Sequence, residues 1–217
     1  MDPALQQSPE FQTALTAAIQ RFCRIYWGPD PELGQQILDP SFLRPLRVLA
    51  PRLGHDITVP LSELDRLLER FSTPQALFSY LEAGYVRLFI NDLGGIPAPL
   101  YASCYEDRET PRLMGAAALR MSNLLVELNL QMGDDLREPP DHLAVELEVL
   151  YYLLTRSSNT GLPDHPVQAA DFAAREVLPW VRALNARLAP EVRCRFYSRA
   201  TTLLVQVLAA IAGSRTS

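Results

Sequence analysis

The chain has 217 residues, of which 48% are hydrophobic and 21% are charged, a balance typical of a soluble globular protein. Its 25 acidic and 20 basic residues give a net charge of −5, which repels phosphate backbones and makes nucleic acid a poor candidate partner. All 20 basic residues are arginines, which excludes enzymes that need a phosphate-loop lysine, a Schiff-base lysine or a Ser-Lys nucleophile pair.

The cysteines and the apolar segments indicate where the protein works. Cys23, Cys104 and Cys194 stand far apart without a CxxC pair, which argues against a zinc knuckle and a disulfide framework. The first ten residues carry neither a basic nor an apolar segment, so we expect no secretory signal there. The longest apolar stretch, 203–212, is interrupted by Gln206 and is too short to span a bilayer. We therefore expect a cytoplasmic protein without stable membrane insertion.

Apolar residues recur every three or four positions along most of the chain, which is the period of an amphipathic helix. This pattern predicts helices over residues 11–26, 61–71, 76–90, 113–130, 143–154, 169–188 and 192–212. Helix starts are expected at residues that cap well or precede a proline, namely Ser62, Thr73, Thr110 and Asp141. No alternating strand pattern of useful length remains, so the expected fold class is all-α, a helical bundle.

Two segments break the helical pattern. Residues 91–112 are rich in glycine and proline, so we expect a hinge that joins an N-terminal helical group, about 1–90, to a C-terminal group, about 113–217. Residues 156–166 are polar and turn-rich, which predicts an exposed loop between two C-terminal helices.

The segment 138–154, EPPDHLAVELEVLYYLL, places a double proline and an Asp-His pair before an apolar helix that carries two glutamates. The prolines predict that the helix begins just after Pro140, with Asp141 as its N-cap. On that register His142 and Glu146 share one helix face. A cap, a surface histidine and solvated glutamates are the commonest roles for such residues. Two functional interpretations also remain open, a catalytic pair and a surface that binds a partner.

Neither catalysis nor metal binding has a complete set of residues. His142 and Glu146 supply two metal ligands, and neither His55 nor His165 has a spacing that identifies a third. The same pair lacks a nucleophile, since Cys104 has no histidine near it in the sequence. We therefore predict no catalytic residue, no metal and no cofactor.

The 91–112 segment also carries a group of aromatic and acidic residues: Pro99, Tyr101, Ser103, Cys104, Tyr105, Glu106, Asp107 and Glu109. Aromatic rings beside carboxylates suit an apolar peptide flanked by arginines, because arginine pairs bidentately with carboxylates. A turn-rich loop whose tyrosines fill the edge of the core fits the composition slightly better, so both interpretations stay open.

The motif EPPDHLAVELEVL resembles the signature of the TorD/DmsD/NarJ family of redox-enzyme maturation chaperones. Two upstream segments agree with it: Tyr85, Leu88 and Phe89 resemble the family's Tyr-x-x-Leu-Phe segment, and Pro99, Tyr101, Ser103 and Tyr105 its Pro-x-Tyr-x-Ser-x-Tyr loop. Downstream, LPWVRALNARL resembles its Pro-Trp helix, and Phe196-Tyr197 resembles the start of its last helix. Glu176 and Asn129 depart from residues that many relatives have, which leaves the subfamily open.

The resemblance implies an all-α chaperone of the TorD/DmsD-like type, not an enzyme. Its partners would be the twin-arginine leader and the apo form of a molybdoenzyme catalytic subunit, held until cofactor insertion is complete. A leader joins an arginine pair to an apolar segment, so its receptor needs carboxylates beside an apolar groove. The expected peptide-binding residues are Tyr85, Phe89, Pro99, Tyr101, Ser103, Tyr105, Glu138, Pro140, Asp141, His142 and Glu146. A monomer or a dimer that swaps helices across the hinge is expected.

Two other classes compete with this interpretation. A helical transcription regulator has a similar size and composition, but prolines at 45, 51 and 60 interrupt the arginine-bearing region where a recognition helix would lie. A metal-dependent hydrolase that uses His142 and Glu146 would retain stoichiometric metal through purification.

Overall fold

The computed structural model describes residues 8–93, 95–106, 113–133, 138–160, 164–190 and 193–214. Within these ranges the regular structure is helical, and the one strand-like contact is a bridge between Tyr101 and His142. The predicted all-α class is thereby confirmed. In chain order the elements are α2 (Pro9–Tyr26), α3 (Pro31–Leu38), α4 (Arg44–Leu53), α5 (His55–Leu68), α6 (Pro74–Tyr85), η1 (Val86–Ile90), η2 (Ala102–Tyr105), α7 (Ala116–Glu127), α8 (Leu143–Thr160), α9 (Asp164–Phe172), η3 (Ala173–Val177), α10 (Leu178–Leu188) and α11 (Arg195–Gly213).

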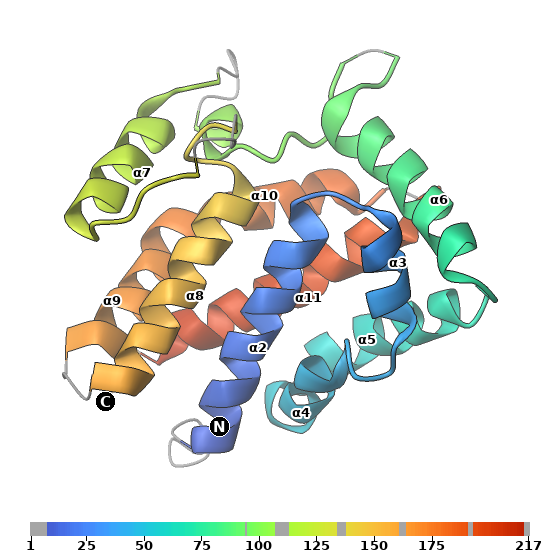
Figure 1. Cartoon of the computed structure of the whole chain (residues 1–217), viewed down its shortest axis with the longest axis horizontal. Helices are drawn as coiled ribbons and strands as arrows, with labels where there is room; N and C mark the ends of the chain where they lie inside the picture. The colour runs from blue at the N-terminus through green and yellow to red at the C-terminus, as the bar shows by residue number, and fades with distance from the viewer. Residues whose placement is uncertain are drawn as a thin grey trace.

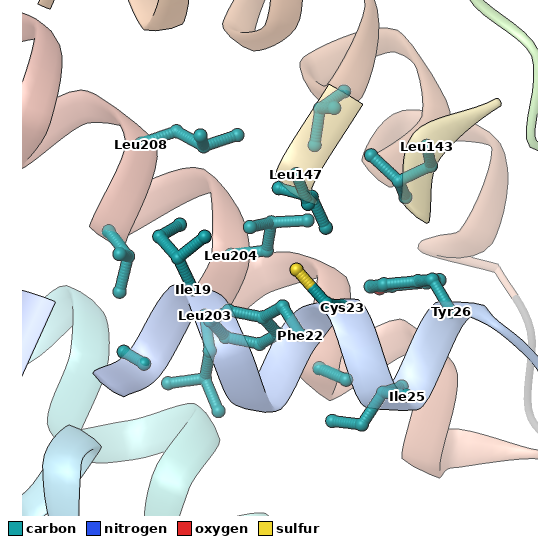
Figure 2. Packing of buried hydrophobic residues seen from close by; sticks show 14 of the residues in the cluster. Ile19, Phe22, Cys23, Ile25, Tyr26, Leu143, Leu147, Leu203, Leu204 and Leu208 are labelled. Carbon is teal, nitrogen blue, oxygen red and sulfur yellow. The ribbon is translucent and has the colours of Figure 1, made fainter. Parts of the chain in front are cut away.

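The helices before and after residues 91–112 share one core. Helix α2 packs along α8, and α11 packs along both α5 and α10 (Figure 1). Figure 2 shows leucines of α8 and α11 gathered around α2, where Ile19, Phe22 and Tyr26 are buried. The two predicted groups therefore bury their apolar faces against each other, and motion at residues 91–112 stays a prediction.

Three N-terminal helices begin with the same local device. The side chains of Ser8, Asp30 and Thr73 accept hydrogen bonds from backbone amides in the first turns of α2, α3 and α6. Each cap is followed by a proline, whose missing N–H costs nothing at a first helical position. The start predicted at Thr73 is confirmed, whereas the one at Thr110 lies outside the described residues.

The start predicted at Ser62 is wrong, because α5 begins at His55 and runs through Pro60. Buried Ile57, Leu61 and Leu64 continue one apolar stripe past the proline. Their burial outweighs the one hydrogen bond that the proline ring removes. The short helices α3 and α4 were not predicted for a related reason: they contain few apolar turns and, in α4, a proline inside the helix.

Two further boundaries differ from expectation. Helix α8 continues to Thr160 and α9 begins at Asp164, so residues 156–160 and 164–166 of the predicted loop are helical. The helix predicted from residue 113 begins at Ala116, after Met114 adopts a positive φ of 59°.

Helix α11 is the one helix among the described residues that is long and apolar enough to cross a membrane by length and composition. The helix lies inside the fold, however, with 61% of its apolar window buried. It is a core helix, as the buried Leu203, Leu204 and Leu208 in Figure 2 illustrate.

The contact between α3 and α6 offers a test of the packing. A Cβ atom added at Gly34 would lie 2.6 Å from the carbonyl oxygen of Pro74 and 3.2 Å from Cβ of Phe78. Because a backbone oxygen cannot swing aside, Gly34→Ala is expected to lower the free energy of unfolding by about 1–3 kcal/mol. Chemical denaturation measures this loss. The control is Gly213→Ala, since no atom lies within 4 Å of a Cβ there, and equal stability of the two variants would contradict the packing.

Candidate functional site

The loop that carries the predicted tyrosines is hydrogen-bonded to the segment that enters α8. The amide of Ala102 donates to the carbonyl of Asp141 at 3.0 Å, and the amide of Leu143 donates to the carbonyl of Leu100 at 2.8 Å. Tyr101 and His142 pair between them as an antiparallel bridge. The residues that the motifs singled out around 99–105 and 138–146 therefore form one site.

Asp141 holds the loop and does not cap its own helix, so the predicted N-cap is wrong. Its side chain is fully buried, and Oδ2 accepts a hydrogen bond from the amide of Ser103 at 2.9 Å. The cap is His142, whose Nδ1 accepts from the amide of Ala144 at 3.2 Å and whose carbonyl accepts from Glu146 at 3.1 Å. The bridge to Tyr101 keeps the chain extended through His142, which moves the helix start to Leu143.

His142 is buried, so the interpretation as a surface ring is wrong. Its imidazole stacks on Trp27 with ring centres 5.5 Å apart and meets the edge of Tyr101 at 5.2 Å. Burial lowers the pKa of His142, while the nearby carboxylates of Glu138 and Asp141 raise it. Trp27 is the residue that directly follows α2.

Glu146 is also buried, which corrects the expectation of a solvated side chain. Its Oε2 accepts a hydrogen bond from Nε1 of Trp180 at 2.8 Å. Burial raises the pKa of Glu146 well above its ordinary value, and the hydrogen bond from Trp180 lowers it in part. Between residues 141 and 150 only Glu148 is exposed, so α8 begins as a helix buried on nearly every side.

The outer part of the site is half-exposed. The Tyr101 hydroxyl donates to Oε2 of Glu138 at 2.7 Å, and the Tyr105 hydroxyl donates to the carbonyl of Pro99 at 2.9 Å. Pro140 is half-exposed beside Glu138. We call Pro99, Tyr101, Tyr105, Glu138 and Pro140 the tyrosine surface. The other predicted residues of this loop and helix start, namely Ser103, Asp141, His142 and Glu146, are buried beneath it and support it.

Tyr85 and Phe89 belong to a buried aromatic cluster. Phe89 is only 2% exposed and packs edge-on against Tyr85 and Tyr197. The Tyr85 hydroxyl donates to the carbonyl of Tyr26 at 3.2 Å. Burial and the charge of Glu138 raise the pKa of Tyr85.

Several supporting residues were not predicted. The ring of Tyr105 packs on Trp180 and lies beneath the guanidinium of Arg187, 4.3 Å from the ring centre. Arg120 bridges Glu106 and Glu176 at 2.9 and 2.8 Å, while Asp107 and Glu109 lie outside the described residues. Sequence spacing gives no signal for such contacts, because the partners come from different helices.

The chemistry of the site favours binding over catalysis. Glu146 and His142 each use a polar atom to hold another part of the protein, Trp180 and the amide of Ala144 respectively. Among the described residues no group of three or more His, Cys, Asp and Glu side chains is placed to hold a metal ion. The fold and the site together define a helical protein whose tyrosine surface rests on a buried Asp-His-Glu set.

Comparison with known proteins identifies the family. Residues 51–186 match the family model described as nitrate reductase delta subunit. Chaperone protein TorD of Vibrio atlanticus (strain LGP32) is 29% identical over 83% of this chain and 88% of its own length. Chaperone protein TorD of Vibrio vulnificus (strain YJ016) is 28% identical over 86% and 90% of the two chains. A solved structure from Archaeoglobus fulgidus, described as a proposed redox enzyme maturation protein, covers 88% of this chain at 20% identity with a TM-score of 0.45.

The chain belongs to the nitrate reductase delta subunit family, the TorD/DmsD/NarJ family of redox-enzyme maturation chaperones. The resemblance stated from the motifs is thereby confirmed. The protein is a maturation chaperone and not an enzyme, and this assignment replaces the regulator and hydrolase interpretations.

Proposed function

We propose that this chaperone binds the twin-arginine leader and the apo form of a molybdenum-containing oxidoreductase in the cytoplasm, before cofactor insertion and export. The observation that supports the proposal is the tyrosine surface, where the Tyr101 hydroxyl donates to the carboxylate of Glu138 beside the half-exposed Pro140. Such a surface offers a leader both contacts that it needs, a carboxylate for arginine and an apolar area for the segment that follows.

Glu138 is the residue best suited to receive an arginine of the leader. Its carboxylate already accepts the Tyr101 hydroxyl, and a carboxylate has acceptor sites left for a guanidinium. The net charge of −5 also attracts a basic peptide at long range.

The buried residues would fix the surface before the peptide arrives. Asp141 accepts a hydrogen bond from the amide of Ser103, and His142 packs between Trp27 and Tyr101. A loop held by these contacts loses less conformational entropy when a peptide binds, so more of the contact energy contributes to affinity.

Calorimetric titration with leader peptides of the organism's own molybdoenzymes tests the proposal. Glu138→Gln is expected to weaken the binding of one leader about tenfold, because it removes the charge that pairs with arginine and keeps an acceptor for Tyr101. Glu82→Gln, an exposed change on α6, serves as the matched control and is expected to bind like the unmodified protein.

A second peptide with its arginine pair changed to glutamine completes a double-mutant cycle. Glu138→Gln should have almost no further effect on this peptide, since one half of the pair is already missing. Equal losses with both peptides would show that Glu138 does not contact the arginines. If no leader bound to the folded protein, the leader-binding proposal would be wrong, and a pull-down with mature apoenzyme would test the remaining part.

A further inference from the structure

A group of arginines lines a pocket whose residues are distant in sequence from the motifs of the tyrosine surface. Helices α5 and α11 pack side by side (Figure 1), and a cavity of about 230 Å³ lies where they meet. Its lining consists of Glu63, Arg66, Leu67, Arg70, Arg195 and Arg199. We call this cavity the arginine pocket.

The helix geometry brings the four guanidinium groups together. Arg66 lies in the last turn of α5 and Arg70 lies in the turn just past its end, and both border the cavity. Arg195 and Arg199 stand one turn apart at the start of α11. Residues spaced by four on a helix share one face, so these two arginines border the cavity together. Like charges at that spacing repel, so the arrangement does not favour the fold on its own.

The positive charge of the pocket is mostly uncompensated. Arg199 forms an ion pair with Glu63 at 2.5 Å. Arg66, Arg70 and Arg195 are exposed, and their side chains form no ion pair within the described parts of the chain. Four arginines against one glutamate give the lining a strongly positive charge, although the whole protein carries −5.

The start of α11 adds to this positive field. Its first turn holds no acidic residue that would offset the charge of the helix end. The N-terminal end of a helix carries a partial positive charge, which usually selects acidic residues rather than the arginines found here. Two features, namely the cavity lined by arginines and the positive end of α11, thus favour an anion at one place.

We propose that the arginine pocket binds a dianionic phosphoryl group, carried either by a small phosphate ester or by a phospholipid headgroup. Guanidinium forks match the oxygens of a phosphoryl group bidentately, and two charges on one group offset more of the repulsion than a single carboxylate does. A polypeptide carboxylate fits less well, because it brings one negative charge where a phosphoryl group brings two.

Titration calorimetry with inorganic pyrophosphate at low ionic strength tests this site. Saturable binding is expected, and the paired change Arg66→Gln with Arg195→Gln should raise Kd by about tenfold or more. Arg44→Gln, a change of an exposed arginine on α4, is the control and should bind like the unmodified protein. Glu63→Gln should tighten binding, because it removes the one negative charge of the lining. This opposite sign would not arise from damage to the fold.

Two further titrations distinguish the sources of the phosphoryl group. Glycerol phosphate represents the soluble esters, and phosphatidylcholine vesicles with and without phosphatidic acid represent a lipid surface. The proposal is supported if glycerol phosphate or the vesicles with phosphatidic acid bind to the unmodified protein and not to the paired variant. The ligand that binds then identifies the source of the phosphoryl group. Absence of pyrophosphate binding, equal binding by the paired variant, or a preference for polyglutamate over pyrophosphate would overturn it. The paired variant should still bind leader peptides. A negative result for the arginine pocket would therefore leave the proposed leader binding intact, and the reverse also holds.

Discussion

Replacing Glu146 by glutamine is expected to stabilise the fold at neutral pH and to flatten the dependence of its stability on pH. The carboxyl group of Glu146 is 1% exposed, and its Oε2 accepts the indole N–H of Trp180. Burial raises its pKa well above the ordinary value, so the folded protein keeps this carboxyl protonated where an exposed glutamate is charged. Glutamine is neutral at every pH and retains an oxygen for Trp180.

The direction of the effect follows from proton linkage. Above the ordinary pKa of 4.5 the unfolded chain releases the proton of Glu146, whereas the folded chain retains it. Each further pH unit therefore costs the native state about 1.4 kcal/mol, until the raised pKa of the folded protein is reached. This penalty is absent below pH 4.5 and is absent at any pH in Glu146→Gln.

Chemical denaturation over a series of pH values measures the difference between the two proteins. The pKa of His142 is lowered, so this residue acts in the opposite direction below its ordinary value of 6.5. Burial raises the pKa of Cys23 and Cys194 above the ordinary value of 9.0, so the range between pH 6.5 and about 8 isolates Glu146. Glu82→Gln, an exposed change on α6, is the control and should follow the unmodified protein within about 0.5 kcal/mol. Parallel curves for Glu146→Gln and the unmodified protein would mean that Glu146 is ionised in the fold.

The sequence predicts helices best where one face of a helix is buried and the other is exposed. Helix α2 alternates in this way, with Phe11, Leu15, Phe22 and Tyr26 buried along one side, and its predicted range agrees with the structure. Helices α3 and α4 are too short to repeat the pattern, and α5 crosses a proline that reads as a break. Tertiary packing, which a local pattern does not contain, decides these cases.

For the candidate site, too, the sequence predicts some features and misses others. The motifs correctly brought residues 99–105 and 138–146 to attention, and the structure joins them through the bridge between Tyr101 and His142. The cap expected at Asp141, the surface ring expected at His142 and the solvated side chain expected at Glu146 were wrong, because the contacts of each residue depend on a distant partner. Ser103, Trp27 and Trp180 supply those partners from three other parts of the chain. Helical periodicity describes neighbours within one helix, so it placed these side chains on a polar face that is in fact buried.

Replacing Asp141 by alanine is expected to lower the free energy of unfolding by about 2–4 kcal/mol, since it leaves a buried donor without an acceptor. The side chain is fully buried, and its Oδ2 is the acceptor for the amide of Ser103. Asp141→Asn keeps an oxygen at this position and should lose much less. Chemical denaturation gives the stability, and hydrogen exchange at the Ser103 amide reports the bond itself.

Ser103→Ala is the matched control, because the bond uses the backbone of Ser103 and not its side chain. Its hydroxyl is buried and forms no hydrogen bond within the described structure, so its removal should leave stability unchanged or slightly raised. The two changes lie on opposite sides of one 2.9 Å contact, yet only the one at Asp141 should cost stability. Equal losses in both variants would show that the carboxylate does not fasten the loop.

The same pair of variants connects stability to the proposed function. With the Ser103 amide released, the loop that carries Tyr101 and Tyr105 should gain freedom, and ordering it again would reduce the affinity for a leader. Asp141→Ala is therefore expected to bind leader peptides more weakly at temperatures where it is still folded, whereas Ser103→Ala should bind them normally. If a folded Asp141→Ala variant bound leader peptides with unchanged affinity, the buried carboxylate would stabilise the fold without contributing to peptide binding.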